Sequence, residues 1–299
     1  MKKLLSLCAV ALTATVLQAA PEKLLVVSTT TGFRHSSIET GEKILTQLAK
    51  DSGAFTVDFV QQPPGHAPTG FPTKLKPEAS EADKAAFTTA EAAWNDQLKS
   101  ALQKLSPENL KNYDGVLFLS TTGDLPIPDR QGFLDWIKAG HAFIGIHAAA
   151  DTFHGWSEFT EMLGGEFAHH GKQVGVECLN QDPKNPATAH LGKSWTIQQE
   201  EIYQFKNYDP TKVHDLLILD KHPESNADGH FGVAWTKRYG SGNVFYTSLG
   251  HREDVWDTDP AIKDRKNSVE ISTAYQAHVL GGIKWALGLD AGAQSVKKP

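Results

Sequence analysis

Short apolar runs recur along most of the chain. Seven runs of five to seven residues are rich in Val, Ile, Leu and Phe, which is typical of β-strands. Several are apolar at nearly every position, as expected for strands of a parallel sheet that is buried on both faces. The predicted strands span residues 24–30, 55–60, 115–120, 142–147, 216–220, 232–237 and 243–248.

Helical patterns lie between these strands. Apolar residues fall on one side of the segments 37–50 and 129–139, and further helices are expected at 81–105 and 274–287. The alternation of strands and helices predicts an α/β fold, a three-layer, doubly wound arrangement around a mostly parallel sheet. Residues 61–80 are rich in Pro and Gly, which indicates an irregular surface loop.

The N-terminus has the pattern of a secretory signal peptide. Lys2 and Lys3 precede an apolar stretch from Leu4 to Val16, and small residues follow, with cleavage expected after Ala19. The apolar stretch is shorter than the roughly 20 residues that a membrane span needs. The sequence therefore predicts residues 1–19 as a signal peptide, 20–290 as one domain and 291–299 as a tail. The mature protein is expected to be periplasmic or secreted and not to be embedded in a membrane.

Charge and cysteine content narrow the function classes. The formal charge of the full chain is −6, and removal of Lys2 and Lys3 makes it −8. A mildly acidic chain without a basic run argues against a nucleic-acid partner. Only Cys178 remains after cleavage, so no disulfide can form within the chain, and Cys178 is expected to be structural. The sequence leaves a homo-oligomer open.

Polar residues follow several predicted strands at the point where each ends. Thr31, Arg34 and His35 follow the first strand, His147 and Asp151 follow the fourth, and His251 follows the last. Ligands of open α/β sheets bind beyond the carboxyl ends of the strands. Three histidines at this edge therefore predict one shared polar site.

His147 lies at a predicted strand-to-helix turn. Ile144, Gly145 and Ile146 precede it and three alanines follow, so small neighbours would let its side chain stand exposed at the top of the sheet, as in a nucleophile elbow. An imidazole there can be a metal ligand, a hydrogen-bond donor or a general acid or base. The alternative is a buried histidine whose nitrogens bond the backbone.

Further candidates lie in later segments. Glu166, His169 and His170 follow a Gly-Gly pair and are expected on a loop, and Glu201 introduces a short strand-like run with Tyr203 and Phe205. A carboxylate beside histidines suits a divalent metal such as Zn²⁺, or a general base. No local metal motif such as HExxH occurs, so the site would assemble from distant segments. Aromatic faces that a sugar ring could contact are Trp156, Tyr203 and Trp235.

Together these segments resemble the ThuA-like (trehalose utilisation) family. The resemblance is carried, in order, by TGFRH at 31–35, GIHAAAD at 145–151, GGEF at 164–167 with His169, EEIY at 200–203, and AW at 234–235 with YGSGNVFY at 239–246 and LGH at 249–251. It implies a flavodoxin-like fold related to class I glutamine amidotransferases, and a link to disaccharide or keto-sugar catabolism. By position, the family's polar site would fall on His35, His147, Asp151, His169, Glu201 and His251.

One departure bears on the reaction. The amidotransferase relatives carry a catalytic cysteine at the elbow where this chain has His147, so glutamine hydrolysis is not expected.

The leading hypothesis is an exported, metal-assisted enzyme that acts on a disaccharide or keto-glycoside. Metal ligands would be His35, His147, His169 and His251. His147, Asp151 and Glu201 would carry the chemistry, with Asp151 or Glu201 as general base. Ligand contacts would come from Thr31, Arg34, His35, Trp156, Tyr203 and Trp235. Two alternatives stay open: a non-catalytic periplasmic module that binds a sugar or a metal, and an interaction or scaffold protein.

Overall fold

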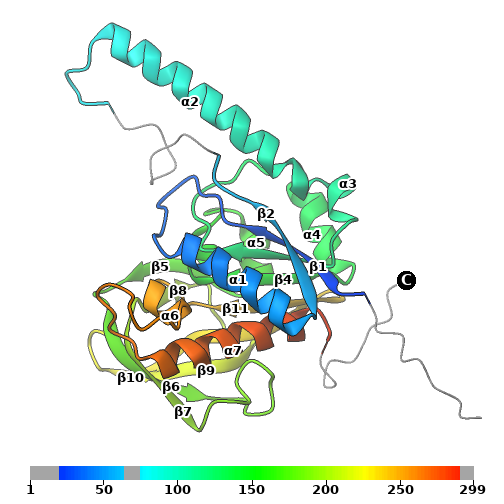
Figure 1. Cartoon of the computed structure of the whole chain (residues 1–299), viewed down its shortest axis with the longest axis vertical. Helices are drawn as coiled ribbons and strands as arrows, with labels where there is room; N and C mark the ends of the chain where they lie inside the picture. Colours follow the sequence, from blue (N-terminus) through cyan, green and yellow to red (C-terminus); the bar gives the residue numbers. More distant parts are fainter. Residues whose placement is uncertain (1–19, 64–74, 290–299) are drawn as a thin grey trace, which may run out of the picture.

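A computed structural model describes residues 20–63 and 75–289. Its centre is a nine-stranded sheet in the order β2-β1-β3-β4-β11-β10-β9-β6-β7 (Figure 1). The first five strands in this order are parallel to one another. Their order is that of flavodoxin-like folds, so the predicted fold class is confirmed. These strands are β1 (Glu22–Val27), β2 (Phe55–Val60), β3 (Gly115–Leu119), β4 (Ala142–Ile146) and β11 (Gly242–Thr247).

Antiparallel strands extend the sheet beyond β11. They are β10 (Asp228–Tyr239), β9 (His214–Lys221), β6 (Val174–Asn180) and β7 (Ser194–Glu200). The sequence analysis missed β6 and β7, because their polar and apolar residues alternate and one face of each strand is exposed to solvent. Cys178 lies buried in β6, and burial raises the pKa of its thiol to about 12, as expected for a structural cysteine.

Helices cover both faces of the sheet (Figure 1). On one face α1 (Ile38–Ser52), α6 (Glu253–Trp256) and α7 (Val269–Ala286) pack over one apolar cluster. On the other face a second apolar cluster holds side chains of α2 (Glu81–Leu102), α3 (Pro107–Leu110), α4 (Arg130–Lys138) and α5 (Ser157–Leu163). The single turns η1 (Gln103–Leu105) and η2 (His147–Asp151) complete the described elements. The three predicted layers are therefore present.

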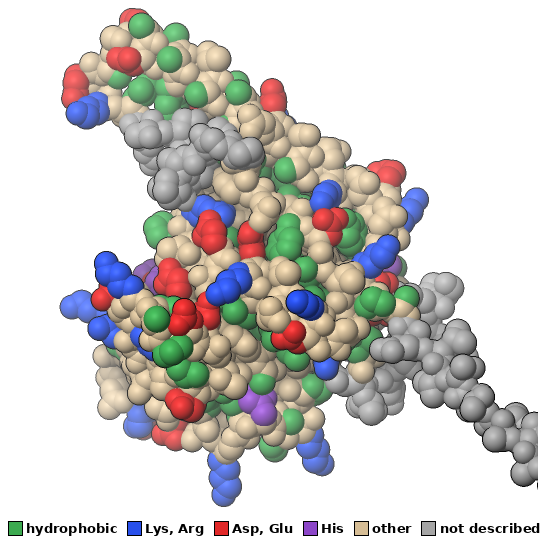
Figure 2. Space-filling view, viewed as in Figure 1, with side chains coloured by type: hydrophobic (Ala, Val, Ile, Leu, Met, Phe, Trp, Pro, Cys, Tyr) green, Lys and Arg blue, Asp and Glu red, His purple; other side chains and the backbone are tan. Residues whose placement is uncertain are grey.

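Helix α2 contacts the rest of the protein mainly through its second half. It begins at Ser80 with a capping box, and its buried residues are Trp94, Leu98 and Leu102. The first turns project from the body (Figure 1) and expose small hydrophobic side chains (Figure 2). Acidic and basic side chains are interspersed over the face in Figure 2.

A two-stranded sheet lies apart from the central one. Strand β5 (Glu166–His170) pairs antiparallel with β8 (Tyr203–Lys206). The expectation that Glu166 to His170 form a loop is therefore wrong. The Gly-Gly pair ends α5 instead, with Gly164 in the left-handed conformation at φ 97°, and the next residues enter the strand. We call these two strands, which are not consecutive in the chain, the β5–β8 strand pair.

The predicted signal peptide, most of the Pro/Gly-rich segment and the predicted tail lie outside the described residues. Within residues 20–63 and 75–289, no helix has the length and apolar character that crossing a bilayer requires.

Candidate functional site

Four side chains from four separate segments meet at the carboxyl edge of the parallel strands. His35 lies between β1 and α1, His147 directly follows β4, Glu201 joins β7 to β8, and His251 lies between β11 and α6. One nitrogen or carboxylate oxygen from each lies within 4.8 Å of those of the others. We call these four residues the histidine cluster. All four were expected at a shared site, and the structure brings them together.

The backbone at His147 is a sharp elbow. The residue has φ 50°, a left-handed conformation that is costly for a residue other than glycine, and the turn η2 begins there. Gly145 makes room for the elbow, since a Cβ on it would lie 2.9 Å from the Tyr246 ring. The predicted turn is therefore present. The expected exposure is wrong, however: His147 is 0% exposed, because the β5–β8 strand pair lies over it.

Hydrogen bonding fixes the tautomer of His147. Its Nδ1 lies 2.7 Å from the carbonyl oxygen of Ser248. A carbonyl only accepts, so Nδ1 carries the hydrogen, and in the neutral ring the Nε2 lone pair is left for the cluster. Imidazoles that bind metals commonly have their second nitrogen held in this way.

Several acceptor atoms converge on this Nε2. Nε2 of His35 lies 3.3 Å away and Oε2 of Glu201 lies 3.5 Å away. The same Glu201 oxygen lies 3.2 Å from Nδ1 of His251. That Nδ1 and Nδ1 of His35 are buried without a well-directed hydrogen bond. The cluster thus brings four atoms that can bind a cation close together.

Electrostatics keeps two rings neutral and the carboxylate charged. Burial, with the nearby charges of His147 and His251, lowers the pKa of His35 to about 2. Burial also lowers the pKa of His147 and outweighs the opposing effect of Glu201. Burial alone would raise the pKa of Glu201, but the nearby imidazoles of His147 and His251 hold it well below its usual range. Neutral imidazole and ionised carboxylate are the forms that bind metals.

His251 differs from the other two rings. Burial opposes its protonation, but the nearby carboxylates of Glu201 and Glu200 raise its pKa. Its side chain is 20% exposed, the most of the four.

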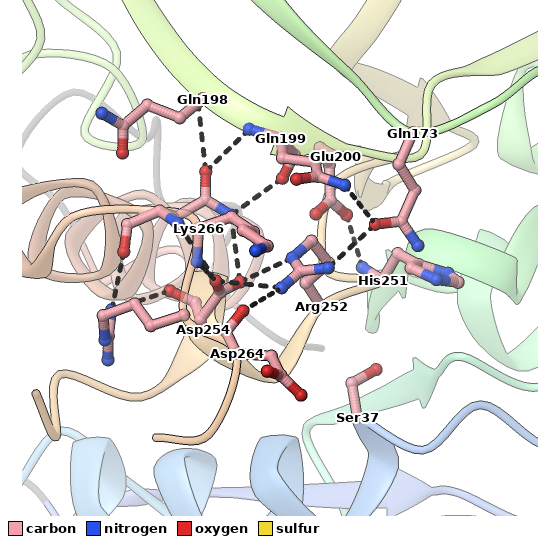
Figure 3. A network of polar contacts seen from close by, with 12 residues as sticks. Ser37, Gln173, Gln198, Gln199, Glu200, His251, Arg252, Asp254, Asp264 and Lys266 are labelled. Atoms are coloured by element: carbon pink, nitrogen blue, oxygen red, sulfur yellow. Dashed lines mark hydrogen bonds and ion pairs between the residues drawn. The ribbon is translucent and has the colours of Figure 1, made fainter. Parts of the chain in front are cut away.

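Glu200 holds the loop of His251 from behind. Its Oε1 accepts hydrogen bonds from the backbone nitrogens of Gly250 and His251, at 3.0 and 2.5 Å (Figure 3). Glu200 is 0% exposed, and burial raises its pKa to about 7. Adjacent carboxylates therefore have different roles: Glu201 faces the rings and Glu200 positions the backbone.

The β5–β8 strand pair supplies two further side chains beside the histidine cluster. The Tyr203 hydroxyl lies 3.1 Å from Nε2 of His147, and burial raises the pKa of Tyr203, which keeps the hydroxyl protonated. Nδ1 of His170 lies 3.0 Å from Oε1 of Glu201. Tyr203 was an expected ligand contact. His170 was a candidate from the same segment as His169, but the predicted metal ligand was His169.

His169 does not join the histidine cluster. It lies instead near His222 and Glu224 on the exposed side of the β5–β8 strand pair. A β-bulge between Phe167 and His169 helps decide which of the two adjacent histidines faces the site, and it is His170. The sequence did not reveal this register.

Asp151 is engaged elsewhere. Its Oδ1 lies 2.5 Å from Nε2 of His154, whose Nδ1 lies 2.6 Å from Glu166. Burial would lower the pKa of His154, but Asp151 and Glu166 together raise it. Asp151 therefore ties the turn after His147 to β5, which does not fit the expected role of general base.

The other expected ligand contacts have structural roles. Trp235 is fully buried and its indole donates to the carbonyl of Leu163. Trp156 packs on Phe153 and Phe159. The Arg34 guanidinium bonds the Ser28 carbonyl and Glu39, and the Thr31 hydroxyl bonds the Thr122 carbonyl. Aromatic or polar character in a sequence does not reveal these partners.

The histidine cluster has the donor set and the spacing of a metal centre. Zinc bonds nitrogen and oxygen ligands at about 2.0–2.1 Å, which separates the ligands of a tetrahedron by about 3.3 Å. The contacts His35–His147, His147–Glu201 and His251–Glu201 are 3.3, 3.5 and 3.2 Å. Three imidazoles and one carboxylate therefore fit a borderline-soft divalent ion such as Zn²⁺.

Comparison with known proteins identifies the family. The family model described as ThuA, trehalose utilisation, matches residues 23–286. The chain belongs to this family. Family membership supports a carbohydrate-related role. No functionally curated protein matches the chain.

Two solved ThuA-like structures are similar over almost their whole length. One, from Parabacteroides merdae ATCC 43184, is 21% identical with a TM-score of 0.60 and coverage of 93% of each chain. The other, from Bacteroides uniformis ATCC 8492, is 18% identical with a TM-score of 0.58, and covers 94% of this chain and 98% of its own. At these identities the likeness shows the shared ThuA fold.

Proposed function

We propose that this ThuA-family protein is a metal-assisted enzyme that acts on an oxidised (keto) glycoside. The observation that carries the proposal is the convergence of His35, His147, Glu201 and His251, with two buried ring nitrogens that lack a well-directed hydrogen bond. A cation held there would stabilise negative charge on a sugar oxygen and favour removal of a proton beside a carbonyl.

The chain itself supplies a group that can take this proton. Nδ1 of His170 lies 2.8 Å from the carbonyl of Gly171 and 3.0 Å from Glu201. Both partners accept, so Nδ1 carries the hydrogen and Nε2 holds the lone pair of the neutral ring. The side chain is 40% exposed, whereas both oxygens of Glu201 face histidine rings. In the proposed step the sugar C–H bond breaks, its proton passes to Nε2 of His170, and its electron pair moves to the carbonyl oxygen.

Metal content is the first test. Protein purified without a histidine tag is expected to hold one equivalent of a divalent metal by elemental analysis. His147→Ala should lose it, because the ligand at the elbow is gone. A metal-free wild-type protein that also fails to bind added Zn²⁺ or Mn²⁺ would refute the metal site.

Turnover is the second test, and adjacent histidines offer a matched pair. With a 3-keto disaccharide in D₂O, wild-type protein should catalyse exchange of the proton beside the carbonyl, followed by NMR. His170→Gln should slow exchange about 10²-fold or more, as expected for loss of a general base, and His169→Gln should not. Equal rates in both variants would contradict the role of His170.

One observation favours a second function, a non-catalytic binding module. Three of the four cluster residues are almost completely buried, which suits retention of an ion better than rapid exchange of a substrate. Calorimetry would then show tight ligand binding without turnover, and binding would survive His170→Gln.

Export is part of the proposal. The charged and apolar pattern of residues 1–19 supports it. Mass spectrometry of protein from the native host should find a mature N-terminus at Ala20, and an intact Met1 in the recovered protein would contradict it.

A further inference from the structure

Phe33 is conspicuous among the described side chains because it is large, apolar and 65% exposed. Only two other large hydrophobic side chains among residues 20–63 and 75–289 are exposed, Leu75 at 38% and Leu289 at 39%. Each of those borders a segment outside the described residues, whereas Phe33 lies within the first described range. Burying a phenyl ring would stabilise a protein by about 1.5–3 kcal/mol. Phe33, which lies beside the candidate site, does not contribute this stabilisation because its ring is exposed.

The loop that carries Phe33 is firmly held. The Thr122 hydroxyl donates to the carbonyl of Phe33 at 2.7 Å, and the backbone nitrogen of Thr31 donates to the Thr122 carbonyl at 3.0 Å. Gly123, at φ 77°, lets the two loops approach, since a Cβ on it would lie 2.4 Å from the Thr31 hydroxyl. The exposed ring is therefore presented by a fixed backbone, so binding to it would cost little ordering of the loop.

Phe33 also leads directly into the histidine cluster. Its ring meets the His35 ring edge to face, with centroids 4.9 Å apart. The His35 ring in turn lies 4.7 Å from that of His147 and 5.3 Å from that of His251. A ligand that lies on the exposed phenyl ring would therefore be next to the candidate reactive centre.

The surroundings of Phe33 indicate the class of ligand. Arg34, the neighbouring cation, is already bonded to the Ser28 carbonyl and to Glu39. A phosphorylated sugar would find no available counter-charge in this residue, whereas a neutral pyranose presents C–H groups that pack on an aromatic face. We infer that Phe33 is the stacking platform that selects a neutral sugar ring for this site. This inference rests on the proposed function.

The test uses full-length mature protein and isothermal calorimetry with trehalose and its 3-keto form. Phe33→Ala is expected to weaken the binding of both sugars about ten-fold. Phe33→Trp should keep the dissociation constant within about two-fold of wild type, because the aromatic face remains. Phe33→Leu should behave like Phe33→Ala, since bulk without a π face does not stack.

Two controls separate the possible failures. Leu75→Ala removes an exposed apolar side chain elsewhere and should leave sugar binding unchanged. Zinc binding should be the same in Phe33→Ala and in wild type, which shows that the cluster is intact. If wild type binds sugar and Phe33→Ala binds it equally well, the stacking role is overturned and the proposed function stands. If wild type binds zinc but neither sugar, the sugar-directed function and the role of Phe33 both fall.

Discussion

Two buried polar networks meet at His251 and its neighbour Arg252, and they are built on opposite principles. In the histidine cluster, ring nitrogens and a carboxylate face one another, and Nδ1 of His35 and of His251 lack a well-directed hydrogen bond. The second network, which we call the Asp254 network, comprises Arg252, Asp254, Lys266 and Asn267, and the first three are labelled in Figure 3. There the carboxylate of Asp254 accepts five hydrogen bonds, two of them from Arg252.

The difference separates a network that stabilises the fold from a cluster that could hold a metal ion. Burial would raise the pKa of Asp254, yet its donors lower it to about 2, so the charged form is the one that the fold favours. The histidine cluster keeps acceptors together without such compensation, which is the pattern of a site rather than of a core.

The largest expected effect of breaking this contrast is on stability. Asp254→Asn should lower the free energy of unfolding by about 3 kcal/mol, because it leaves Arg252 and several buried donors without their charged acceptor. Denaturant unfolding measures the change. Asp264→Asn is the control, since Asp264 contributes only its backbone carbonyl to Arg252 and its side chain is exposed. Equal stability of both variants would show that the Asp254 network is not an anchor.

A smaller effect is expected from the other network, and only with metal present. A ligand at 100 times its dissociation constant stabilises the folded state by about 2.7 kcal/mol. Zinc should therefore raise the unfolding temperature of wild type but not of His147→Ala. His278→Asn is the control, because His278 is equally buried but lies in α7 outside the histidine cluster, bonded to the Ala187 carbonyl. Loss of the zinc response in that variant too would place the metal elsewhere.

The smallest expected effect concerns His154, which links the elbow turn to β5. Its pKa is raised in the folded state by Asp151 and Glu166. Its contribution is therefore complete below the usual histidine pKa and is lost as pH rises through the raised pKa. Because the side chain is 44% exposed, the contribution should be below about 1 kcal/mol.

Unfolding curves between pH 6 and 9 test this effect. Wild type should lose stability relative to His154→Gln as pH rises, and the difference should shrink in 1 M salt, which screens exposed charges. Parallel curves would show that His154 stays in one protonation state across this range.

Periodicity was enough to predict the parallel half of the sheet and strands β9 and β10 of its antiparallel extension, but not β6 and β7. Strands such as β3 and β4 are apolar at every position, because both faces are covered. Strands β6 and β7 carry polar residues on an exposed face, and such alternation over seven residues is weak against the surrounding loops.

The candidate site was predictable where it depends on topology. His35, His147 and His251 follow parallel strands, so the fold class alone brings them to one edge. The choice between His169 and His170 depends on a bulge, and the packing of Trp156 and Trp235 depends on tertiary contacts, neither of which a single sequence displays. Phe33 was overlooked because exposure cannot be read from residue type.

The way the β5–β8 strand pair is connected limits how the cover over His147 can move. Between its strands the chain runs back to the edge of the central sheet to form β6 and β7. The cover over His147 is thus anchored to the central sheet through both of its strands, unlike a flap that moves about a single hinge.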